Sequence, residues 1–168
     1  MKTGQVIITN GPLILPLVNG EYPGHVFKVA AGETIELTTK VTLHTRAKVD
    51  YLQFITNGKS VAEIRLDQWA KENGELPKIE FAESGWMVIR AVCRSDQEYR
   101  YASTAPYYVQ VDDEPRISRK AAQFFLDWTV ELAKRIKKNP GSHPDVDLAS
   151  LRNARDFWNS KVAAANAD

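Results

Sequence analysis

The spacing of apolar residues changes once along this chain, near Pro115, and that change limits what the chain can fold into. Before Pro115, apolar and polar residues alternate over stretches such as residues 34–43, which is the pattern of half-buried β-strands. After it, apolar residues recur at spacings of three and four, as on one face of an α-helix: Ile117, Ala121, Phe125, Trp128, Leu132 and Ile136. The sequence therefore predicts a mainly β fold with an α appendage: a β-sandwich over residues 1–113, then a helical hairpin over residues 114–168.

The β region divides into short segments bounded by turn residues. The clearest hairpin spans residues 49–66, because Asn57-Gly58 is the residue pair that a type I′ turn favours. A short helix is predicted at residues 67–73, with Gly74 as its end. Short strands at this spacing are typical of a β-sandwich. We expect strands at residues 6–9, 13–18, 25–29, 34–43, 49–56, 60–66, 78–81, 86–92 and 99–111.

Two helices are predicted after Pro115. Ser118 is the expected N-cap of the first, and residues 139–144 separate it from the second, which begins with Asp145 or Asp147 as its cap. An antiparallel pair of helices cannot bury all its apolar residues alone. We therefore expect the hairpin to dock on the sandwich or on a neighbour, with Trp128 buried. The tail, residues 163–168, is expected to fray.

Charge and composition argue against several classes of partner. The 168 residues include 22 Lys and Arg against 21 Asp and Glu, a formal net charge of +1. This balance gives no general attraction to nucleic acid or to anionic lipid, so we expect neither as a partner. The sequence shows no signal peptide and no transmembrane segment. The compartment is left open, as is export of a longer parent protein.

The residues that carry chemistry are scattered. His25, His44 and His143 have no spacing typical of a metal site, and the acidic run at residues 112–114 lacks the surroundings of a calcium loop. Cys93, the single cysteine, lies in a predicted strand without a nearby base and is interpreted as a structural thiol. We therefore expect no catalytic residue, no metal and no cofactor.

Aromatic residues with neighbouring arginines form one candidate site. Rings on a sandwich face can stack on sugars or other planar ligands, whereas rings that alternate along a strand more often fill the core. Both interpretations are kept. The residues of this candidate ligand platform are Trp86, Arg90, Tyr99, Tyr101 and Tyr107.

The other candidate site is the start of the chain. Asn10-Gly11 is a turn signal because both residues tolerate positive φ, and the proline that follows fixes its own φ. No charged residue lies between Gln5 and Val18, so the first strand has no charge to block edge pairing with a partner or a second copy. The predicted docking residues are Ile7, Thr9, Asn10, Gly11, Pro12, Leu13 and Leu15.

Several short motifs, in this order and spacing, resemble the C-terminal region of the CehA/McbA-like PHP-type metal-dependent hydrolases over nearly the whole chain. The helical segment resembles an extension that only some of these proteins have. The motifs are Thr9-Asn10-Gly11-Pro12-Leu13, Val18-Asn19-Gly20, Pro23-Gly24, Ser84-Gly85-Trp86, Ile89-Arg90-Ala91-Val92, Thr104-Ala105-Pro106-Tyr107-Tyr108-Val109, Pro115-Arg116-Ile117-Ser118 and Ala122-Gln123-Phe124-Phe125-Leu126-Asp127-Trp128.

The resemblance implies a fold and a role. In that family an immunoglobulin-like β-sandwich follows a distorted barrel that holds the metals, and the Thr9–Pro12 motif marks the seam between the two. The metal ligands lie in the barrel, so none maps onto this chain. The resemblance therefore implies a non-catalytic accessory module that packs on a hydrolase barrel in cis or in trans. A carbohydrate- or ligand-binding sandwich that uses exposed aromatic residues is the alternative.

Overall fold

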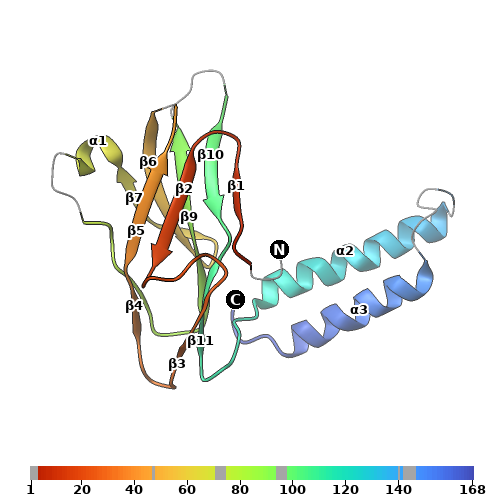
Figure 1. Cartoon of the computed structure of the whole chain (residues 1–168). Coiled ribbons are helices and arrows are strands. Elements are labelled where there is room, and N and C mark those ends of the chain that lie inside the picture. Colours follow the sequence, from red (N-terminus) through yellow and green to blue (C-terminus); the bar gives the residue numbers. More distant parts are fainter. Residues whose placement is uncertain (1–3, 47, 71–74, 94–97, 140, 142–146) are drawn as a thin grey trace. The chain divides into compact units, whose positions relative to one another are not determined.

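A computed structural model of the chain describes residues 4–46, 48–70, 75–93, 98–139, 141 and 147–168 (Figure 1). Two compact units follow one another along the chain, Met1–Pro115 and Arg116–Asp168. The first unit contains the strands, and the second contains the two long helices. Among the described residues, no helix is long and apolar enough to cross a membrane.

The first unit is built from short strands in three sheets. A seven-stranded sheet has the order β1-β10-β9-β11-β3, and β6 pairs with both β9 and β7; β2 pairs with β5, and β4 pairs with β8. All these pairs are antiparallel except β11 with β3. The elements are β1 (Ile7–Thr9), β2 (Leu13–Val18), β3 (Val26–Val29), β4 (Ile35–Leu37), β5 (Thr39–His44), β6 (Val49–Thr56), β7 (Lys59–Arg65), α1 (Leu66–Trp69), β8 (Ile79–Phe81), β9 (Gly85–Cys93), β10 (Arg100–Thr104) and β11 (Tyr107–Val111).

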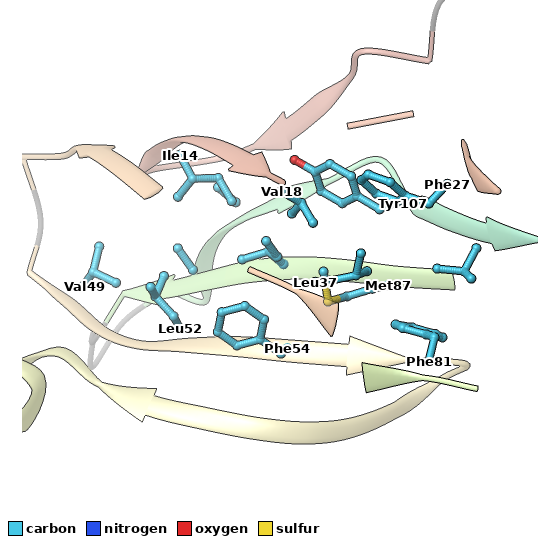
Figure 2. Close-up of a cluster of buried hydrophobic side chains, with 14 of the residues drawn as sticks. Ile14, Val18, Phe27, Leu37, Val49, Leu52, Phe54, Phe81, Met87 and Tyr107 are labelled. Atoms are coloured by element: carbon cyan, nitrogen blue, oxygen red, sulfur yellow. The ribbon is translucent and has the colours of Figure 1, made fainter. Parts of the chain in front are cut away.

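One apolar core joins the three sheets. Along β9 the side chains alternate, so that Met87 and Ile89 are fully buried while Trp86 and Arg90 face the other way and are half-buried. Ile14 of β2 belongs to the same buried cluster, and Figure 2 shows it on the opposite side of the core from β6. Burial of each large side chain of this kind contributes about 1.5–3 kcal/mol. The prediction of a mainly β fold with a β-sandwich is confirmed.

Two predicted strands are each divided in two. The predicted strand at residues 34–43 is β4 and β5, which lie in different sheets and are separated by Thr38. The Asn19 carboxamide explains the break, because its Oδ1 accepts hydrogen bonds from Thr38 N and Oγ1, each at 2.8 Å. The predicted strand at residues 99–111 is β10 and β11, which are separated by Ala105-Pro106. The described residues thus form eleven strands, more than the sequence predicted.

Other boundaries agree closely with the sequence prediction. The β6–β7 hairpin turns at Asn57-Gly58, where φ is +50° and +84°, as a type I′ turn requires. Cys93 is buried at the end of β9, as expected of a structural thiol. The predicted helix at residues 67–73 is described as α1, four residues long, and the rest of it, residues 71–74, lies outside the described part.

The second unit is a pair of antiparallel helices, α2 (Arg119–Lys138) and α3 (Leu148–Ala163). Ser118 caps α2 by accepting a hydrogen bond from Ala121 N at 3.2 Å, as predicted. Asp147, one of the two predicted caps of α3, accepts from Ser150 N at 2.7 Å; the other, Asp145, lies outside the described residues. These bonds lower the pKa of Asp147. The predicted helical hairpin is confirmed.

The start of α2 is joined to the end of α3. Arg119 N donates to Ala167 O at 2.7 Å, and Ile117 N donates to the Asn166 side chain at 2.8 Å. The Arg119 guanidinium also donates to Val162 O at 3.2 Å. The expectation that residues 163–168 fray is therefore wrong, because the tail forms backbone hydrogen bonds with the beginning of the hairpin.

Trp128 is not buried as expected: its side chain is 62% exposed. The ring that fills the space between the helices is Phe125, which stacks on Trp158 with 4.7 Å between ring centres. Trp128 follows Phe125 by three residues, about 60° away around the helix. This offset places the Trp128 side chain on the flank of the hairpin. The spacing of apolar residues along the sequence does not distinguish this flank from the buried face.

Candidate interaction site

The turn between β1 and β2 is held by side chains rather than by positive φ. The Thr9 hydroxyl accepts from Gly11 N at 3.0 Å and donates to Pro12 O. Neither Asn10 nor Gly11 has positive φ, so the physical reason given for this turn was wrong, although the turn itself is present. A Cβ on Gly11 would lie 3.0 Å from the Arg100 Cβ, which is the constraint that favours glycine here.

Hydrogen bonds of Asn10 connect this turn to β10. Its Oδ1 accepts from Tyr101 N at 2.7 Å, and its Nδ2 donates to Tyr99 O at 2.9 Å. Its own backbone N donates to Tyr101 O at 3.1 Å. The carboxamide thus continues the β1–β10 ladder one step beyond the strand, and fixes where the chain leaves the seven-stranded sheet for β2.

The strands on either side of the turn have free backbone edges. β1 is the last strand of its sheet, and β2 pairs only with β5, so each has one side without a strand partner among the described elements. We call these two free edges together the β1–β2 edge. Its exposed apolar side chains are Ile8 (63% exposed), which the strand pairing places on the same side of the seven-stranded sheet as Arg90, and Leu13 and Leu15 (39% and 43%), which lie on the outer side of β2, opposite the buried Ile14. Unpaired strand edges without charge are surfaces on which another chain can pair.

The predicted docking residues do not all belong to this edge. Ile7 packs against the core and is half-buried, whereas its neighbour Ile8, which the prediction omitted, faces outward. Pro12 is fully buried, so its side chain takes no part in an exposed surface. Thr9, Asn10 and Gly11 form the turn. The strand alternation places Ile7 and Ile8 on opposite sides, but does not tell which of the two faces the core.

Most of the predicted platform residues lie on the outer face of the seven-stranded sheet. Trp86 and Arg90 of β9 face outward together, and the Arg90 guanidinium lies 5.8 Å from the centre of the Tyr101 ring. The rings of Tyr99 and Tyr101 are 5.4 Å apart. Arg90 Nε is buried without a hydrogen-bond partner in the described part of the chain. A buried donor left unpaired costs about 1–3 kcal/mol.

Tyr107 does not belong to the platform. Its side chain is fully buried in the core, where its hydroxyl donates to Pro16 O at 3.1 Å. Burial raises the pKa of Tyr107. Of the two adjacent tyrosines, Tyr108 is the one that faces outward, paired with Trp86 across the strands.

Tyr51 is a further member of the ring-bearing face, and it was not among the predicted platform residues. It pairs with Val92 on β9, two residues from Arg90 and on the same side of the strand. Burial raises the pKa of Tyr51, and the nearby Tyr99 raises it further. The alternation of Tyr51 with the buried Leu52 along β6 could have revealed it. We define the ring face as Tyr51, Trp86, Arg90, Tyr99, Tyr101 and Tyr108.

The titratable residues singled out earlier lie apart. His25 Nδ1 lies 3.3 Å from Glu21 Oε2, His44 is exposed on β5, and His143 lies outside the described residues. Asp113 pairs with Lys28 at 2.6 Å. Within the described ranges, no three His, Cys, Asp or Glu side chains are grouped as a metal site would require.

A cavity of about 530 Å³ opens beside β5 and α1. Its wall is mainly apolar, including Val41, Leu43 and Trp69, and it also contains Thr39, whose hydroxyl is buried without a partner among the described residues. No sequence pattern pointed to this cavity, because its wall is assembled from residues far apart along the chain.

Two solved structures show a distant likeness to this chain. One contains the fibronectin(III)-like modules of CbhA from Clostridium thermocellum, with 13% identity over 58% of this chain and 98% of that chain, at a TM-score of 0.34. The other is a lytic polysaccharide monooxygenase from Jonesia denitrificans, with 12% identity over 53% of this chain and 59% of that chain, at a TM-score of 0.28. No protein family and no curated protein matches the chain.

Proposed function

We propose that this chain is a non-catalytic accessory module with an immunoglobulin-like sandwich, which binds a metal-dependent hydrolase barrel of the CehA/McbA-like PHP type in cis or in trans. The β1–β2 edge is the observation that carries the proposal. It combines free strand edges, exposed Ile8, Leu13 and Leu15, and a stretch from Gln5 to Val18 without a charged residue. Surfaces of this kind are usual at contacts between domains or proteins.

The turn gives this edge a fixed shape. Asn10 bonds to the backbone of β10 and Thr9 bonds within the turn, so β1 and β2 leave the turn in a defined relation. A prearranged surface loses little conformational entropy when a partner binds. The resemblance of the Thr9–Pro12 motif to the family's seam supports the barrel as the partner at this place.

The test adds a separately produced barrel from that family to the chain, with association measured by calorimetry. Ile8→Lys and Leu15→Lys should each weaken binding about tenfold or more, which corresponds to about 1.4 kcal/mol. Val61→Lys is the matched control, because Val61 is 50% exposed on β7, away from the β1–β2 edge. Failure of the barrel to bind, equal effects of all three variants, or hydrolysis of phosphoesters or carbamates by the chain itself would each refute the proposal.

The ring face supports a second candidate, a carbohydrate-binding sandwich. Its rings lie on one side of one sheet, and the half-buried Arg90 lies among them, with its guanidinium 5.8 Å from the centre of the Tyr101 ring. Aromatic rings bind the apolar faces of sugars, and a guanidinium donates to hydroxyl or carboxylate oxygens.

This candidate is tested by pull-down on insoluble polysaccharides and by titration with soluble oligosaccharides. Trp86→Ala and Tyr108→Ala should abolish retention, while Phe124→Ala, at an exposed ring in the helical unit, should not. Retention of no polysaccharide, or equal retention of all variants, would exclude the carbohydrate candidate and leave the accessory proposal unaffected.

A further inference from the structure

A groove of about 320 Å³ runs between α2 and α3 on one flank of the hairpin. Its floor is apolar, and its most exposed member is Leu148, at 58%. Its rim is basic. The floor consists of Val130, Ala133, Leu148 and Leu151, with Thr129 at one end, and the rim of Lys134, Lys137, Arg152 and Arg155.

Acidic residues of the hairpin pair with only some of the basic residues of this groove. Lys134 lies 3.9 Å from Glu131, and Arg155 pairs with Asp156 at 2.7 Å. Lys137 and Arg152 form no ion pair with any described residue. Residues 116–168 contain ten Lys and Arg against six Asp and Glu, so the excess positive charge lies in the part of the chain that forms the groove.

From this juxtaposition we propose that the groove binds an acidic amphipathic helix of a partner protein. An apolar channel between two helices accepts the apolar ridge of a third, with side chains spaced three and four apart. Acidic residues beside that ridge would meet Lys137 and Arg152, the two rim cations without an ion pair among the described residues, which gives the pairing its specificity and its dependence on salt. The site is separate from the β1–β2 edge, so this proposal does not rest on the hydrolase partner.

A peptide fits the groove better than a membrane surface does. A helix that lies on a membrane carries its basic residues beside its exposed rings. Here the exposed rings of Phe124, Trp128 and Phe157 do not line the groove. Trp128 and Val130 differ by two residues, about 200° around α2. The cation that lies over the Phe157 ring, Lys161, is not one of the rim residues. The surface between the basic residues is concave, which suits a narrow ridge and not a flat lipid headgroup layer.

The probe is a labelled amphipathic peptide of about 18 residues, with leucine on one face and glutamate on the rest, titrated with the full chain and followed by fluorescence anisotropy. The double variant Lys137→Glu/Arg152→Glu should weaken binding about tenfold or more. The double variant Lys120→Glu/Lys138→Glu changes the net charge equally, at α2 positions that do not line the groove, and should weaken binding less than about threefold.

Apolar contacts are tested separately. Leu148→Ala should weaken peptide binding without changing its salt dependence, while Trp128→Ala, at an equally exposed residue off the groove, should leave binding unchanged. No binding of the peptide, equal losses in the two charge-reversal variants, or binding only to vesicles that contain phosphatidylglycerol would overturn the proposal.

Discussion

Asn10 and Tyr101 exchange two hydrogen bonds, although Asn10 lies beyond the end of β1. Asn10 N donates to Tyr101 O at 3.1 Å, and Tyr101 N donates to Asn10 Oδ1 at 2.7 Å. The side-chain oxygen thus occupies the place of a backbone carbonyl. The chain can therefore turn away toward β2 without leaving the Tyr101 amide unpaired.

Replacement of Asn10 by alanine should destabilise the sandwich by about 1–2 kcal/mol, because the Tyr101 amide and the Tyr99 carbonyl each lose a partner. Urea unfolding followed by far-ultraviolet circular dichroism measures this change. Asn159→Ala, at an exposed position of α3, is the control and should cost less than about 0.5 kcal/mol. Equal effects of the two substitutions would mean that the Asn10 carboxamide contributes nothing to the turn.

Two other Asn-Gly pairs, Asn19-Gly20 and Asn57-Gly58, also use the asparagine side chain in this way. Asn19 bonds to Thr38 and Glu36, and Asn57 accepts from Trp86 N at 3.1 Å. The turns at Asn10-Gly11 and Asn57-Gly58 were predicted from the residue pair alone. What each side chain bonds to could not be predicted in this way, because those partners lie 17 to 91 residues away along the chain.

Gly85 should not tolerate a side chain. A Cβ there would lie 2.8 Å from Phe81 Cε1 and 2.9 Å from the Asn57 side chain, so Gly85→Ala forces the turn and the core apart. The expected cost is about 1–3 kcal/mol. Gly141→Ala is the control, since a Cβ at that position would have no described atom within 4 Å. A stability of Gly85→Ala equal to that of Gly141→Ala would show that Phe81 moves freely aside.

Two tryptophans of the helical unit should differ in their effect on stability. Trp158 is half-buried and stacks on Phe125, so Trp158→Ala should cost about 2–3 kcal/mol. Trp128 is exposed, and Trp128→Ala should cost less than about 1 kcal/mol. Thermal unfolding of the helices, followed by circular dichroism, compares them. A larger loss for Trp128→Ala would indicate that a contact covers its ring in solution.

The stability of α3 should depend on pH through its cap. Hydrogen bonds from Ser150 lower the pKa of Asp147 in the folded chain. The cap therefore contributes fully above the ordinary pKa of aspartate, and its contribution is lost as the pH falls through the lowered folded value. Asp147→Asn keeps an acceptor without this titration, so its helicity should change less between neutral and acidic pH. Identical pH profiles for the two proteins would contradict this role.

The class of each region could be predicted from the sequence, whereas the assignment of particular residues to core or surface often could not. Period two identified the strands and period 3.6 the helices, because these patterns are local. The inward side of a strand depends on which sheet it joins. For this reason Tyr107 was kept as a candidate for the surface platform beside the core interpretation, and Ile8 was omitted from the docking residues. In the same way, the division of residues 34–43 into two strands could not be predicted, because it depends on a hydrogen bond from Thr38 to Asn19, which is distant in sequence.

The last prediction concerns association of the chain with itself. In the absence of another partner, β1 offers an uncharged edge with Ile8 63% exposed, so two copies should pair there in a concentration-dependent manner. Pro16 within β2 removes a backbone donor on the neighbouring strand, which directs the pairing to β1.

Sedimentation velocity over a range of concentrations measures this association. Ile8→Lys should raise the dimer dissociation constant about tenfold or more, since it places a charge on the edge without disturbing the core. Val61→Lys, the control on β7, should leave association unchanged. Ile7→Lys distinguishes loss of fold from loss of pairing: Ile7 packs on the core, so this variant should lower the unfolding midpoint, whereas Ile8→Lys should not. A chain that stays monomeric at all concentrations, or a dimer that Ile8→Lys does not weaken, would show that this edge does not pair.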